Sequence, residues 1–431
     1  MRPSAVAVFR GYSAFQLRRL LERLREGLYD PLAVRLLTVH HEALDTRIQS
    51  DLLDSVADTG RHLCLCGAYG QGKSHTLAYI HEYALHQGYV VSAINLDPRE
   101  VPLHQFRQVY RALLRAMTLP ASPVGTAAPG SFIEAWRTWA GAQRLDTTDP
   151  AMALAALLPA SMPHVFKAIL VALARPTQEI PTGLRILARY RDFRPADFPW
   201  TLRRALYGET VPVARLRAAL KYRQVSFYRQ ASLALSGHEP FLHMTLALPQ
   251  LFRTMGYRGW VLLFDEGEAI AQVPRPLRAR SYRLLHHLLC PESPSPGLYP
   301  VFAFTPDFFQ RLHEEDYDWP AFERNYAQAW RDLAVYHLRG LSLAAWQNLC
   351  GTLIVLHAAA YGWHADQEHL LPLLTTRLTT LPLHDPRATL KALVDELDQV
   401  QQHTFFAQRT GDTPPRIGDR SAWSPSPEHM P

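Results

Sequence analysis

Cysteine, lysine and long apolar runs are all scarce in this chain. Four cysteines among 431 residues are too few and too scattered for a disulfide framework or a zinc site, so we expect reduced core thiols. The most apolar stretch, residues 151–174, is interrupted by prolines, a histidine and a lysine, short of the ~20 apolar residues of a membrane span. No secretory signal is recognisable at the N-terminus, and we expect a cytoplasmic protein.

One of the few lysines completes a motif. Residues 67–74 read GAYGQGKS, which matches the phosphate-loop pattern G-x-x-x-x-G-K-[ST], and they follow an apolar run at 62–66 that predicts a buried strand. Glycines let successive backbone N–H groups turn toward phosphates, and the helix that follows adds its positive N-terminal end. We therefore predict that Lys73 reaches the β- and γ-phosphates of ATP and that Ser74 binds Mg²⁺. An ordinary glycine-rich turn is the alternative.

A second apolar run, residues 260–264, ends in the acids Asp265 and Glu266, which is typical of a Walker B strand. We expect Asp265 in the Mg²⁺ shell and Glu266 as the base that orients and deprotonates the attacking water. The alternative is a strand end that faces solvent. Glu268 adds a third acid to which we assign no role.

Two more apolar runs, at 90–97 and 299–305, predict further strands of the same sheet. The second run ends at Thr305, where related ATPases carry a γ-phosphate sensor, so Thr305 is our candidate for that role. A threonine that merely ends a strand before Pro306 fits the sequence equally well.

The net charge of +6 and the pI of about 9.1 make nucleic acid a plausible partner without establishing it. Basic residues gather between 203 and 229, with aromatic residues among them. The candidate DNA-contacting residues are Arg215, Arg217, Lys221, Arg223 and Arg229. A solvated helix face whose arginines cover apolar surface is the alternative.

The spacing of the motifs divides the chain. Lys73 and Asp265 lie 192 positions apart, more than a compact nucleotide-binding core needs, so an insertion must separate them. The predicted segments are a helical lead-in (1–60), the first part of the ATPase core (61–115), a mostly helical insertion (116–250), the second part of the core (251–318), a helical domain (319–408) and a disordered proline-rich tail (409–431). Asp385 and Pro386 predict a helix start. Arg387 then lies in the first turn, where a cation is unfavourable, and we expect it to reach a phosphate; a surface arginine is the alternative.

These motifs together resemble the bacterial BREX-system ATP-binding proteins, a P-loop family with AAA+ features, and within it the BrxD-type proteins of phage-defence loci. The resemblance runs from about residue 11 to residue 400. Its pieces are residues 67–75, 91–98, 255–260, 264–268 and 385–387, together with the long gap between the Walker motifs.

The resemblance implies an α/β P-loop NTPase (AAA+-like) with a parallel sheet, a large helical insertion and a C-terminal helical lid. It implies ATP and Mg²⁺ as cofactors, and Arg387 as a sensor-like arginine. The implied nucleotide contacts are Gly67, Ala68, Tyr69, Gly70, Gln71, Gly72, Lys73, Ser74 and His75. In AAA+ ATPases adenine packs just before the first core helix, which makes residues 37–40 the candidate adenine contact. Arg324 and Arg331 both fit an arginine finger, and the sequence does not select one.

The leading hypothesis is an antiviral-defence ATPase that couples hydrolysis to DNA binding or to the remodelling of partner proteins. The resemblance implies other defence-system proteins as partners, and it leaves a helicase and a homo-oligomer open. A second hypothesis is a nucleotide-dependent scaffold that recruits defence proteins with little turnover. A kinase is a weaker third, because nothing marks an acceptor site.

Overall fold

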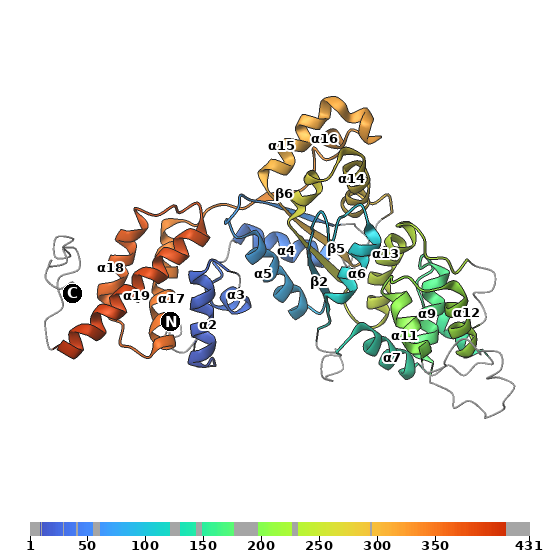
Figure 1. The fold of residues 1–431 in the computed structure, drawn as a ribbon, viewed down its shortest axis with the longest axis horizontal. Helices are drawn as coiled ribbons and strands as arrows, with labels where there is room; N and C mark the ends of the chain where they lie inside the picture. Colours follow the sequence, from blue (N-terminus) through green and yellow to red (C-terminus); the bar gives the residue numbers. More distant parts are fainter. Residues whose placement is uncertain are drawn as a thin grey trace, which may run out of the picture. The chain divides into compact units, whose positions relative to one another are not determined.

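The computed structural model describes residues 9, 11–28, 30–39, 42–54, 61–120, 130–143, 149–175, 197–225, 232–293 and 295–410. These residues form two compact units (Figure 1). The first contains the described residues of 1–39 and 340–431, and the second those of 40–339. The predicted domain boundaries remain predictions.

The second unit is built on a six-stranded sheet of order β3-β2-β4-β5-β1-β6, in which every pairing is parallel except β2 with β3. Its strands are β1 (Leu63–Cys66), β2 (Val90–Asn95), β3 (Met117–Thr118), β4 (Trp260–Asp265), β5 (Leu298–Phe304) and β6 (Val335–His337). All four strands predicted from the sequence are present, and the mixed α/β class with a mostly parallel sheet is confirmed. Since β1, β4 and β5 are parallel, their carboxyl ends meet at one edge.

Both faces of this sheet are buried, which explains why its strands read as continuous apolar runs. On one face, side chains such as Leu65, Leu263 and Val301 pack against α4 (Glu42–Asp54) and α5 (Lys73–His86). Residues next to these along the strands, such as Phe264 and Phe302, point to the other face. The helices on that face are α6 (Phe106–Arg115), α13 (Glu239–Thr254), α14 (Arg275–Leu289) and α15 (Pro306–Glu314).

The predicted insertion is mostly helical in its described part. Its helices are α7 (Phe132–Ala142), α8 (Pro150–Ala156), α9 (His164–Ala174), α11 (Phe198–Leu206) and α12 (Val213–Tyr222), followed by α13. Helices α7, α11 and α12 all pack on α9, whose apolar residues from Ala168 to Leu173 are buried (Figure 1). One apolar core therefore continues from the sheet through α6 and α13 into the insertion.

The segment 319–408, predicted as a helical domain, also contains a strand that the sequence did not predict. This strand is β6, which pairs with β1 and joins the sheet of the second unit. Three half-exposed residues carry too weak an apolar pattern to be recognised as a strand. The short elements between β4 and β6 are η3 (Gly267–Gln272), η4 (Glu315–Phe322) and α16 (Tyr326–Ala329).

The first unit is an all-helical bundle whose core comes from both ends of the chain. Its helices are α2 (Ala14–Arg25), α3 (Pro31–Leu37), α17 (Leu343–Tyr361), α18 (Gln367–Leu378) and α19 (Pro386–Thr410). Asp385 caps α19 as predicted, since its Oδ1 accepts the amides of Arg387 and Ala388 at 3.1 and 3.2 Å. Among the described helices, α17 alone is long and apolar enough to cross a membrane, but Leu353 and Ile354 pack in this core. Residues 411–431 of the predicted tail lie outside the described residues.

Candidate functional site

The loop between β1 and α5, residues Gly67–Gly72, has the backbone shape that its glycines permit. Gly70 and Gly72 adopt φ of 83° and 92°, which favours glycine because a Cβ is strained in this region. Gly72 is also the N-cap of α5 and has no side chain to cap it, so the first amides of the helix remain available to an anion. The amide of Gly67 donates to the carbonyl oxygen of Phe304 at 3.1 Å, which fixes the start of the loop to β5.

The Lys73 side chain closes over this loop. Its ammonium lies 2.9 Å from the carbonyl oxygen of Gly67 and 3.3 Å from that of Ala68, and the residue is only 8% exposed. A buried cation held only by neutral carbonyls gains strongly from an anionic partner. Ser74 and Tyr69 are exposed, whereas His75 is half-buried and its burial lowers the pKa of the imidazole to about 4.

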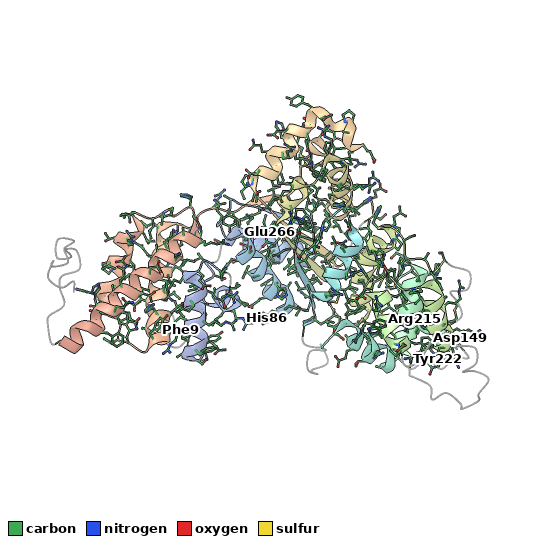
Figure 2. All side chains as sticks on the ribbon, viewed as in Figure 1. Phe9, His86, Asp149, Arg215, Tyr222 and Glu266 are labelled. Carbon is green, nitrogen blue, oxygen red and sulfur yellow. The ribbon has the colours of Figure 1, made fainter. Side chains whose placement is uncertain are left out.

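The two predicted acids lie where β4 ends, at the same sheet edge: Asp265 is the last residue of the strand and Glu266, labelled in Figure 2, follows it. Glu266 adopts φ 56° and ψ 41°, a left-handed conformation that is uncommon for a non-glycine residue and clusters at functional sites. Its amide donates to Oδ1 of Asp265 at 2.9 Å. This bent backbone turns the chain from the strand into η3, so that consecutive acids project from a fixed corner.

The carboxylates at this sheet edge carry more negative charge than the two acids to which the sequence assigned roles. Burial and then the charges of Asp265, Glu268 and Asp97 raise the pKa of Glu266, and Lys73 acts in the opposite direction. Asp97 and Glu268 were given no role from the sequence. The sequence could have pointed to Asp97 by its place just after β2, and to Glu268 by its place two residues after Glu266. In the structure, Oε2 of Glu268 is buried without a hydrogen-bond partner.

Strand order brings Thr305 into this group. β5 lies between β1 and β4, with Phe304 opposite Cys66 and Phe302 opposite Phe264. Thr305 therefore follows the strand that separates the glycine loop from the acids. It is the N-cap residue of α15, yet its side chain caps no amide of that helix. The structure thus brings together Lys73, the glycine loop, the acids and Thr305.

Comparison with known protein families decides where the chain belongs. Residues 13–169 and 234–411 match the family model of the BREX system ATP-binding protein BrxC/D. The chain belongs to this family. This confirms the resemblance and places the protein among the ATP-binding proteins of the BREX phage-defence system. Comparison with curated proteins and with solved structures gives no match.

Several other predicted residues of this BrxC/D-family chain lie elsewhere. Arg387 is exposed in the first turn of α19, in the first unit, and a role in the nucleotide site stays a prediction. Of the candidate adenine contact, His40 lies outside the described residues, while Leu37 packs in the core of the first unit.

The candidate DNA contacts on α12 are divided by the structure. Arg217 and Lys221 are exposed, but Arg215 is half-buried and its guanidinium donates to Oδ2 of Asp197 at 3.1 Å (Figure 2). Arg223 needs a correction: it is 5% exposed and donates to the carbonyl oxygen of Arg175 at 2.8 Å, so it closes the end of α9 and is unavailable to DNA. Arg229 lies outside the described residues.

Proposed function

We propose that this protein is a Mg²⁺-dependent ATPase with a P-loop, AAA+-like core. The observation that carries the proposal is that Lys73, at the start of α5, and Glu266, at the end of β4, lie at one sheet edge within electrostatic reach of each other. The proposed nucleotide contacts are residues 67–75. The loop amides and Lys73 would hold the phosphates, and Glu266 would serve the reaction.

Mg²⁺ fits the residues present. The acids around Glu266 outnumber the cation Lys73, so a triphosphate would be repelled unless a cation neutralised the edge. Within the described residues, no group of three or more His, Cys, Asp or Glu side chains could hold a metal ion alone. Mg²⁺ binds through one or two carboxylates plus substrate phosphates, and Asp265 offers a carboxylate at this edge. Asp265 and Ser74 would hold it, and the bound ion would neutralise charge on the phosphates.

In the reaction that we propose, Glu266 accepts a proton from the attacking water. The water oxygen bonds to the γ-phosphorus, the bond from that phosphorus to the β,γ-bridging oxygen breaks, and ADP and phosphate leave. The raised pKa of Glu266 brings the base nearer to neutral pH, where proton transfer is most effective. The Thr305 hydroxyl would contact the γ-phosphate as a sensor, and Lys73 would compensate the negative charge of that phosphate.

The family supplies the setting for this chemistry. We propose that hydrolysis drives the remodelling of other BREX proteins or of DNA, that a helicase is among the candidate partners, and that neighbouring copies supply an arginine to the site. The nucleotide-dependent scaffold is the competing function, and turnover separates the two.

The test is ATP hydrolysis by the full-length protein with and without Mg²⁺, together with ATP binding by calorimetry. We expect Lys73→Ala to weaken binding and Glu266→Gln to bind ATP while abolishing turnover. Lys391→Ala, which removes an exposed lysine of α19, is the matched control and should change neither property. ATP binding without turnover in the wild type would refute the ATPase and favour the scaffold.

A further inference from the structure

A cavity lies away from the proposed nucleotide site, between the end of α6, the start of α7 and α11. Its volume is about 610 Å³, within the range of ligand sites. The lining residues that matter here are Arg115, Trp200, Arg203, Arg204, Tyr207 and Glu209. Most of them lie in residues 170–233, which the match to the BrxC/D family does not include. The cavity therefore lies largely in the part of the insertion outside the family match.

The cavity carries surplus positive charge. Three arginines against one glutamate leave two positive charges in excess. Glu209 is already engaged, because its carboxylate accepts from Arg204 at 2.6 Å and from Arg115 at 3.2 Å. The Arg203 side chain is exposed and forms no hydrogen bond or ion pair with any of the described residues. An anionic ligand could therefore bind at Arg203 without breaking an existing pair.

The helix α6 concentrates this charge by its periodicity. Arg107, Arg111 and Arg115 follow one another at four-residue intervals, so they project from one face toward the turn after α11. Arg107 and Arg111 donate to the carbonyl oxygen of Gly208 at 2.6 and 3.0 Å, which anchors that turn. Of these three arginines, Arg115 lines the cavity itself.

Aromatic surface lies beside these cations. Trp200 is 53% exposed and lines the cavity. The guanidinium of Arg204 lies 4.5 Å from the centre of its ring and holds the indole in place. Tyr207 lines the same cavity. Bases stack on such aromatic rings and guanidinium planes, while arginines contact the phosphates between them.

We propose that this cavity binds single-stranded nucleic acid, with a base against Trp200 and the backbone phosphates at Arg203 and Arg115. A concave cavity suits an unstacked base better than a duplex, because proteins usually recognise duplex DNA by placing a protruding helix or β-ribbon in the DNA groove. Binding at the cavity does not depend on the proposed ATPase. Only the coupling rests on that function: α6 packs on β2, and Asp97, two residues after β2, acts on Glu266.

The test is the fluorescence anisotropy of labelled oligothymidylate of about 20 nucleotides, longer than the ~4–16-nucleotide sites of single-strand-binding folds. The full-length wild type, Trp200→Ala, Arg203→Ala and Lys391→Ala are compared without ATP over a salt series. Trp200→Ala should weaken binding about 5- to 150-fold, the effect of losing one base stack. Arg203→Ala should lower the slope of log K against log salt by about 0.7, one phosphate contact. Lys391→Ala removes an exposed charge outside the cavity, at a residue that is no candidate DNA contact, and should bind like the wild type.

Equal losses in Arg203→Ala and Lys391→Ala, or none in Trp200→Ala, would overturn the proposal in favour of diffuse attraction. Displacement by thymidine monophosphate, by duplex DNA or by polyglutamate at comparable affinity would also overturn it, and would point to a free nucleotide, a duplex or an acidic protein instead. Trp200→Phe keeps an aromatic ring and should restore most of the affinity, which separates stacking from misfolding. ATP turnover is measured separately, so oligonucleotide binding without turnover would refute the ATPase and leave this site standing.

Discussion

Gly267 follows the proposed base directly, and its hydrogen sits where no methyl group can fit. A Cβ there would lie 2.5 Å from Cε1 of Phe304 and 2.7 Å from the carbonyl oxygen of Ala303. Neither neighbour can move easily. Ala303 belongs to buried β5, and the Phe304 ring is stacked on Phe308 at 4.2 Å between ring centres. We therefore expect Gly267→Ala to push the turn after β4 away from β5.

The magnitude follows from overpacking. Extra methyl groups in well-packed cores cost about 1–3 kcal/mol, and Gly267→Ala should lower the free energy of unfolding by that amount. Because Glu266 is the preceding residue, the displacement also reaches the base. A shift of ~1 Å in a catalytic group can cost on the order of 100-fold in rate, so turnover should fall by about that factor.

Urea unfolding followed by circular dichroism and ATP turnover measure the two effects. Gly141→Ala is the matched control: Gly141 lies in α7, and a Cβ there would meet no atom within 4 Å. It should leave turnover unchanged and stabilise the helix by up to about 1 kcal/mol. If Gly267→Ala kept the wild-type urea midpoint and turnover, the close approach of η3 to β5 would not position Glu266.

Three further predictions test other parts of the structure. Burial and neighbouring carboxylates raise the pKa of Glu266, so turnover should decline as pH falls through that raised pKa. At pH values above this pKa the ionised carboxylate destabilises the fold. Glu266→Gln should therefore raise the thermal unfolding midpoint at neutral pH, and this gain in the midpoint should disappear in acid. Arg223→Ala leaves the C-cap carbonyl of α9 without its donor and should cost about 1–3 kcal/mol of unfolding free energy in urea titrations, without changing oligonucleotide affinity. Burial raises the pKa of Asp398, but hydrogen bonds and charge from His357 and Arg25 outweigh burial and hold that pKa low. The ionised Asp398 therefore stabilises the fold above its unfolded-state pKa, and this stabilisation is lost as pH falls. Asp398→Asn should remove this acid-sensitive part of the stability in thermal unfolding measured across pH.

Much of the nucleotide-binding unit could be predicted because its signals are local. The glycine loop and the strands at 63–66, 90–95, 260–265 and 298–304 each carry their pattern in consecutive residues. Non-local features were missed. The helices at 14–37 pack with those at 343–400, and no local periodicity encodes which distant helices share a core. Arg223 was taken as a phosphate contact because a sequence shows charge but not burial.

The acid cluster depends on strand order, which the sequence does not state. The end of each strand can be predicted from the sequence alone. Asp97 approaches Glu266, however, only because β2 pairs with β4, with Asn95 opposite Asp265. Glu268 approaches from η3, the element that Gly267 allows to lie against β5. Four carboxylates opposite one lysine make the edge hostile to a triphosphate alone. The same charge makes it favourable to a triphosphate that arrives with a divalent cation, so we expect ATP affinity to depend more steeply on Mg²⁺ than affinity at the arginine-lined cavity does.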